Sequence, residues 1–183
     1  MTYNPEIHHR RSIRLKGYDY TQPGAYFVTL VTHHREEIFG EIINGEMKLS
    51  PLGEIVRQEW FRSGEIRREI QLFEDEFAIM PNHGHGVVWI VDGVRPEEDG
   101  VRPSLHRAPR SLGSFIAGFK ASVTSRAKHE LNMTRIWQRN YFEHIIRNEA
   151  EFHNIWNYID ANPLHWQAEQ LHPFAPLNKY NQE

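Results

Sequence analysis

The sequence predicts an α+β domain, in which helices pack on an antiparallel sheet. Residues 24–32 are rich in β-branched and aromatic side chains, which is typical of a strand. Asn44-Gly45 lies between two short apolar-alternating segments, and this pair favours a β-hairpin because both residues tolerate a positive φ. After Ser111, apolar residues recur with the spacing of one helix face. Strands and helices interleaved in this order indicate an antiparallel sheet with helices packed on it.

The first half of the chain is expected to hold most of the strands. Ser50-Pro51 supplies an N-cap residue and a proline at the first helical position, so a helix is expected over 51–63. The remaining strands are expected over four segments, 39–43, 46–49, 70–80 and 85–91.

The second half is expected to add two helices and a strand. Residues 92–110 repeat Gly-Val-Arg-Pro once, so they are expected to form a mobile connection and not a repeat array. The helix starting at Ser111 has its apolar stripe on Leu112, Phe115, Ile116, Phe119 and Val123.

Residues 136–147 are expected to form a further strand or an extended segment, and a last helix follows them. Asn148 with Glu151 three residues later resembles a capping box, and Pro163 is expected to end this helix. Its apolar face consists of Phe152, Ile155, Trp156 and Ile159.

Composition limits the class of protein. The 183 residues are enough for one domain, expected over 23–166 between an arm (1–22) and a tail (167–183). With 0 cysteines, neither a disulfide framework nor a thiolate metal site is possible, and histidine would have to bind any transition metal. No apolar run approaches the roughly 20 residues that span a bilayer, so a cytoplasmic protein is expected.

The net charge of −3 is unevenly distributed, because the N-terminal arm is basic. Its cations are Arg10, Arg11, Arg14 and Lys16. Such an arm is either a solvated tail or a contact for a polyanion.

His83 and His85 stand at the start of a predicted strand. Residues i and i+2 of a strand point to the same face, so the two imidazoles would lie side by side and form half of a metal site. The alternative is a pair of partly exposed polar residues at a strand end.

Tyr158 and Asn162 are four residues apart on the last helix and share one face. Both flank the apolar stripe, so either side chain can face a site on the sheet. The alternatives are a packing tyrosine and an asparagine that only ends the helix before Pro163.

Three motifs occur in this order: His83-Gly84-His85 after Met80-Pro81-Asn82, Trp137-Gln138-Arg139-Asn140-Tyr141, and Tyr158-Ile159-Asp160-Ala161-Asn162-Pro163. Together they resemble the HUH-type single-tyrosine transposases, and within them the REP-associated tyrosine transposases. The opening of that branch resembles residues 11–20, so the likeness runs from about residue 10 to residue 166.

This resemblance implies a ferredoxin-like or RRM-like sheet that carries both histidines. It further implies that His83, His85 and Asn162 bind Mg²⁺ or Mn²⁺ and that Tyr158 attacks DNA to form a 5′-phosphotyrosine. Asn162 stands where many relatives have glutamine. Gly84 stands where they have a bulky apolar residue, and it should point to the opposite face of the strand from the histidines.

Proteins that bind single-stranded DNA combine cationic side chains, which contact the backbone, with aromatic rings on which bases stack. The arm and Lys120 are candidates for the cations, and Trp137 and Tyr141 for base stacking. Tyr141 is also a rival nucleophile, but it lacks an amide partner four residues later. The general base stays open between His144 and His153 or neither.

The sequence therefore predicts a metal-dependent single-strand DNA endonuclease and strand transferase that acts on hairpin or palindromic DNA. The alternatives are a non-catalytic DNA-binding protein on the same fold and a histidine-metal hydrolase unrelated to DNA. The sequence leaves a monomer and a homodimer equally open.

Overall fold

A five-stranded sheet forms the centre of the structure, a computed structural model that describes residues 17–91 and 110–168. Its strands are β1 (Gly24–Val31), β4 (Ile70–Gln71), β5 (Phe77–Met80), β6 (His83–Ile90) and β7 (Phe142–Ile146). Every pairing is antiparallel: β1 lies between β6 and β7, while β4 and β5 pair with the other edge of β6. The antiparallel sheet with packed helices confirms the predicted α+β class.

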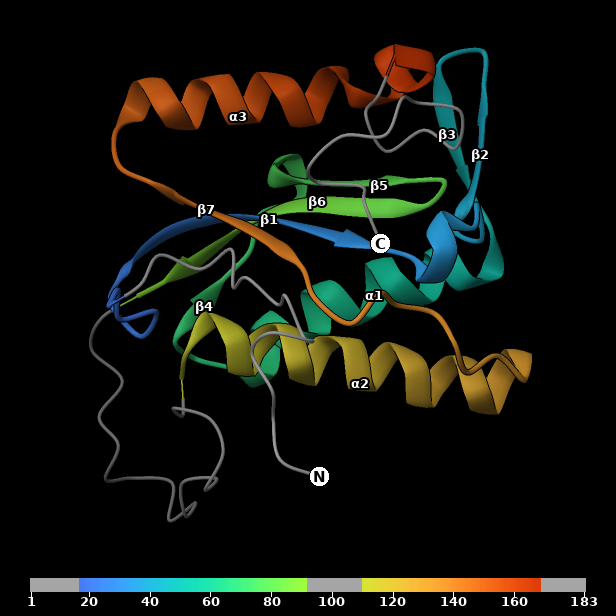
Figure 1. Ribbon diagram of the computed structural model, residues 1–183, viewed down its shortest axis with the longest axis horizontal. Coiled ribbons are helices and arrows are strands. Elements are labelled where there is room, and N and C mark those ends of the chain that lie inside the picture. Colours follow the sequence, from blue (N-terminus) through green and yellow to red (C-terminus); the bar gives the residue numbers. More distant parts are fainter. Residues whose placement is uncertain (1–16, 92–109, 169–183) are drawn as a thin grey trace, which may run out of the picture.

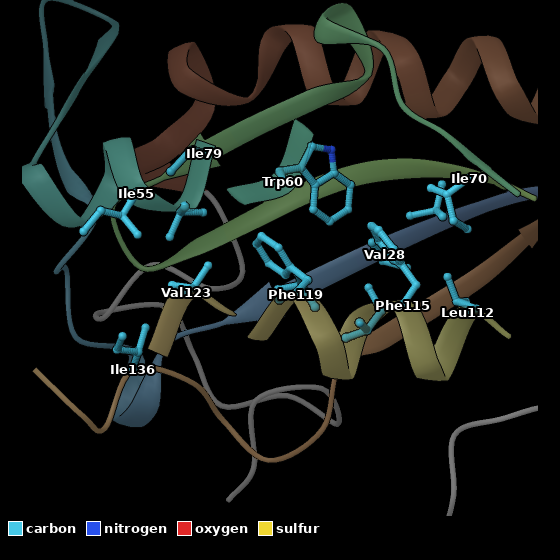
Figure 2. Close-up of a cluster of buried hydrophobic side chains, with 14 of the residues drawn as sticks. Val28, Ile55, Trp60, Ile70, Ile79, Leu112, Phe115, Phe119, Val123 and Ile136 are labelled. Atoms are coloured by element: carbon cyan, nitrogen blue, oxygen red, sulfur yellow. The ribbon is translucent and has the colours of Figure 1, made fainter. Parts of the chain in front are cut away.

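Helices cover both faces of this sheet (Figure 1). On one face, α1 (Pro51–Ile66) and α2 (Leu112–Leu131) pack over the larger core, which includes Trp60 and Phe119. Figure 2 shows these side chains filling the space between the sheet and the two helices. On the other face, α3 (Glu149–Ala161) packs over a smaller cluster of Ala25, Phe27, Val87 and Ile159. None of the described helices combines the length and apolar composition that a bilayer crossing requires.

The predicted caps set the helix starts. The side-chain oxygens of Ser50, Ser111 and Asn148 accept hydrogen bonds from the backbone N–H groups of Gly53, Ser114 and Glu151. Each bond satisfies an N–H that has no partner inside its helix.

The predicted hairpin forms a separate two-stranded sheet, β2 (Gly40–Ile43) with β3 (Glu46–Leu49). Asn44 and Gly45 have φ values of 54° and 80°, as this turn requires. The turn reaches the last described segment, because a Cβ on Gly45 would lie 2.9 Å from Cδ2 of Leu164. The hairpin therefore stands beside η3 (Asn162–Ala168), as Figure 1 shows.

One expected strand was wrong. The segment 70–80 is not one strand, because η2 (Glu74–Glu76) separates β4 from β5. Within 136–147, which was expected to be a strand or an extended segment, β7 is the strand and Trp137 makes a single bridge to Thr32. The last helix ends before Pro163, as predicted, and the chain continues as the 3-10 helix η3.

Several predictions lie outside the described residues. These are the cations Arg10, Arg11, Arg14 and Lys16, the connection 92–109, and residues 169–183 of the predicted tail.

Candidate functional site

The two histidines of β6 lie buried on the face of the sheet that α3 covers. Their register partners on β1, Val31 for His83 and Thr29 for His85, alternate with residues of the larger core. The side chains of His83 and His85 are 0% and 2% exposed, and their Nε2 atoms are 2.8 Å apart. The two imidazoles therefore converge, and they are not the exposed polar pair of the alternative interpretation.

Each ring is also held at its other nitrogen. Nδ1 of His83 lies 2.8 Å from Oδ1 of Asn82, and the amide nitrogen of Asn82 donates to the carbonyl oxygen of Arg35. Nδ1 of His85 lies 2.9 Å from the hydroxyl of Thr29, its partner across the strand pair. These contacts fix the planes of both rings.

Burial keeps the two rings neutral. It lowers the pKa of His85 to about 3, because the imidazolium form would lose its hydration. Burial and the neighbouring His85 lower the pKa of His83 well below its ordinary value. At neutral pH both rings therefore have an unprotonated nitrogen, which is the form that binds cations.

Tyr158 of α3 lies over this pair. Its phenol oxygen is 3.1 Å from Nε2 of His85, and its ring meets those of His85 and Phe27 edge to face. The residue is 40% exposed, so the phenol combines a contact with the buried imidazole and access from solvent.

Asn162, the first residue of η3, is 2% exposed, and neither its amide oxygen nor its amide nitrogen has a hydrogen-bond partner. A buried amide without partners costs free energy unless something else binds it. The same segment covers the histidines, since the Trp166 ring centroid lies 5.9 Å from that of His83.

These donors fit a divalent cation. Imidazole nitrogens and an amide oxygen are accepted ligands, and the orphaned amide of Asn162 is the group that a cation would satisfy. Within residues 17–91 and 110–168, no group of three or more His, Cys, Asp or Glu side chains could hold a metal. A cation site here would therefore depend on the amide.

Gly84 faces the other layer, as expected. Its register partner is Ile79 of the larger core, and a Cβ on Gly84 would meet the Phe77 ring at 3.6 Å. The missing side chain therefore affects packing against β5 and not the imidazoles.

Three predicted DNA contacts have packing roles. The Lys120 ammonium donates to the carbonyl oxygens of Gln138 and Asn140 and lies over the Trp137 ring. Burial lowers the pKa of Lys120 to about 8. Trp137 and Tyr141 pack against the larger core, so the structure does not bring these three side chains to the histidine face.

The two candidate bases lie near the start of α3. The imidazole of His144 is 3.4 Å from Glu151, and Nδ1 of His153 donates to the carbonyl oxygen of Glu149. These contacts give both rings local partners, and the base stays unassigned.

Sequence reasoning missed four residues near the site. Thr29 and Asn82 hold the imidazoles, and the adjacency of Asn82 to His83 was the one available signal. Arg135 and Arg139 are exposed on either side of Trp137, which forms a β-bridge with Thr32. The backbone N–H of Thr32 donates to the carbonyl oxygen of Asn82. The two arginines are therefore cations near the strand end that carries His83.

Comparisons with known proteins agree with this fold. No family model matches the chain. An uncharacterised protein of Haemophilus influenzae is 42% identical over 178 residues, covering 93% of this chain and 97% of that protein. The solved structure of a REP-associated tyrosine transposase bound to a REP hairpin has a TM-score of 0.57 and 18% identity, covering 86% of this chain and 77% of that one. The likeness to the solved structure is one of fold.

Proposed function

We propose a function for this chain from its own site, because the Haemophilus influenzae protein of the same family is uncharacterised. The function is that of a metal-dependent single-strand DNA endonuclease and strand transferase of the REP-associated tyrosine transposase branch. The observation that carries the proposal is the 3.1 Å contact between the Tyr158 phenol and His85, whose Nε2 also meets His83.

His83, His85 and Asn162 would hold Mg²⁺ or Mn²⁺ in this proposal. Such an ion supplies positive charge to the non-bridging oxygens of a phosphodiester and orients it. The buried rings are neutral, so each has one unprotonated nitrogen, and the amide has no other partner.

Tyr158 would be the nucleophile. Its phenol oxygen attacks phosphorus, a bond from phosphorus to the tyrosine oxygen forms, and the bond from phosphorus to the 3′ oxygen breaks. The phenol gives up its proton and the departing 3′ oxygen gains one. The resulting 5′-phosphotyrosine keeps the energy of the phosphoester, so a 3′-hydroxyl can attack it and rejoin the strand.

Hairpin-bearing single-stranded DNA would be the substrate. The fold neighbour is bound to a REP hairpin, and this chain places exposed Arg135 and Arg139 near the strand end that carries His83. Guanidinium groups at that end would bind the DNA backbone while the phenol reaches the scissile phosphate.

The proposal is tested with a hairpin-bearing single-stranded oligonucleotide and Mn²⁺, followed by a denaturing gel. We expect a protein–DNA adduct that retains a 3′-end label, a released fragment with a free 3′-hydroxyl, and loss of both with EDTA. Tyr158→Phe should abolish the adduct, whereas the control Tyr141→Phe should retain it.

An adduct formed by Tyr158→Phe would refute the assignment of the nucleophile. Salt-sensitive hairpin binding without an adduct would instead support the non-catalytic DNA-binding protein. Hydrolysis of a small phosphoester that survives the loss of Tyr158 would support the unrelated hydrolase.

A further inference from the structure

The two imidazoles are held at Nδ1 by groups of different chemistry. His83 meets the side-chain oxygen of Asn82 at 2.8 Å, and His85 meets the hydroxyl of Thr29 at 2.9 Å. An amide oxygen can only accept a hydrogen bond, whereas a hydroxyl can donate or accept. The two partners therefore place different limits on where each ring carries its proton.

Asn82 leaves His83 a single tautomer. The amide group of Asn82 faces the carbonyl oxygen of Arg35 at 3.2 Å, and only its nitrogen can donate to a carbonyl. Its oxygen must then face His83, so Nδ1 of His83 carries the proton. A neutral imidazole has one N–H, and Nε2 of His83 is therefore a bare lone pair.

The proton between the two rings then belongs to His85. The Nε2 atoms are 2.8 Å apart, and a hydrogen bond at that distance needs one proton, which His83 does not supply. The Tyr158 hydroxyl, 3.1 Å from Nε2 of His85, is then a second acceptor of the same N–H. Nδ1 of His85 is consequently bare, and the Thr29 hydroxyl donates to it. Without a cation, His85 thus carries its proton on the nitrogen that a cation would need.

We infer that Asn82 and Thr29 are positioning residues with different tasks, one fixing the tautomer of His83 and the other allowing His85 to change its own. The inference rests on the proposed cation site. When a cation binds, Nε2 of His85 gives its proton to solvent and Nδ1 takes one from solvent. The Thr29 hydroxyl rotates from donor to acceptor, and the charge of the ring is unchanged.

Histidine-ring ¹H–¹⁵N spectra of the full chain test the two tautomers directly. In EDTA we expect a protonated Nδ1 on His83 and a protonated Nε2 on His85. With Mg²⁺, His85 should convert to the Nδ1-protonated form while His83 stays the same. A protonated Nε2 on His83 in EDTA would overturn the inference.

Variants separate positioning from packing. Thr29→Val keeps the shape but cannot accept from Nδ1, so its Mn²⁺ affinity should fall about 10–100-fold, whereas Thr29→Ser should bind like the wild type. Asn82→Leu should lose affinity to a similar extent. Wild-type affinity in Thr29→Val would contradict the role of the hydroxyl. If the valine variant does not fold, the ring spectra of the unaltered chain and of Thr29→Ser still decide.

The failures of the two proposals can be told apart. Mn²⁺ binding with the predicted tautomers but no DNA adduct would refute the endonuclease and leave the positioning roles intact. A wild-type chain that binds no Mn²⁺ would refute the cation site and the roles assigned around it.

Discussion

The ring of Phe77 on β5 lies parallel to the indole of Trp60 on α1, with centroids 4.5 Å apart and planes inclined by 5°. This stack lies against Gly86, because a Cβ on Gly86 would be 2.6 Å from the Trp60 ring and 3.0 Å from that of Phe77. A Cβ on Gly84 would meet Phe77 only at 3.6 Å, an ordinary contact. A side chain at Gly86 would therefore displace the stacked rings, whereas a methyl group at Gly84 would fit.

Gly86→Ala should destabilise the protein by about 1–3 kcal/mol, because the methyl group forces the stacked rings apart. Gly84→Ala is the matched control. It should leave the free energy of unfolding unchanged or raise it by up to about 1 kcal/mol, since alanine reduces the entropy of the unfolded chain. Urea denaturation measures both variants, and equal losses would contradict the stacking argument.

Asn162→Leu should stabilise the metal-free chain and abolish the DNA adduct. The amide is buried without a hydrogen-bond partner, so its replacement by an apolar side chain of similar size should raise the free energy of unfolding by about 1–3 kcal/mol. Urea denaturation in EDTA measures the gain. Asn162→Gln, which keeps an amide, is the control and should retain adduct formation. A leucine variant that is less stable than the wild type in EDTA would contradict this account of Asn162.

Stability should fall as the pH is lowered from 6.5 towards 3. Folding lowers the pKa of His85 from 6.5 to about 3, so between these values the unfolded chain binds more protons than the folded one. The contribution of His85 is complete above pH 6.5 and is lost progressively below it, by about 1.4 kcal/mol per pH unit. Denaturation in EDTA from pH 8 to pH 5 should show this slope in the free energy of unfolding. In His85→Gln, whose side chain does not titrate, the slope should be smaller by that amount. Parallel slopes would show that His85 titrates alike in both states.

Arg135→Glu with Arg139→Glu should weaken binding to hairpin DNA and reduce its salt dependence. Each lost phosphate contact lowers the slope of log affinity against log salt by about 1. The control is Arg57→Glu with Arg68→Glu, because both arginines are exposed but belong to α1 and to the turn before β4, which pairs with the end of β6 opposite His83. Fluorescence anisotropy at several salt concentrations measures both pairs. Equal effects would indicate binding to net charge alone.

Local signals predicted much of the fold. Ser111 and Asn148 cap α2 and α3, because an N-cap needs only its own side chain and the N–H three residues later. The strand period placed His83 and His85 on one face, for a similarly local reason. The single strand expected over 70–80 was wrong, because Glu74, Asp75 and Glu76 form a 3-10 turn. Glu76 accepts a hydrogen bond there from Trp89, which lies on another strand.

Long-range register could not be predicted. Thr29 meets His85 only because β1 and β6 pair in one alignment, and a shift of one residue would remove the hydroxyl. Lys120 lies off the apolar stripe of its helix and was expected to bind DNA. Its acceptors are backbone carbonyl oxygens of an irregular segment, which no side-chain pattern reveals.

The phenol and the imidazole that meet here are 73 residues apart along the chain. As the ribosome makes the protein, β1, β5 and β6 can pair and bring the histidines together long before Tyr158 has been synthesised. On the proposed assignment of Tyr158, a chain interrupted before α3 would lack the nucleophile and could not join itself to DNA.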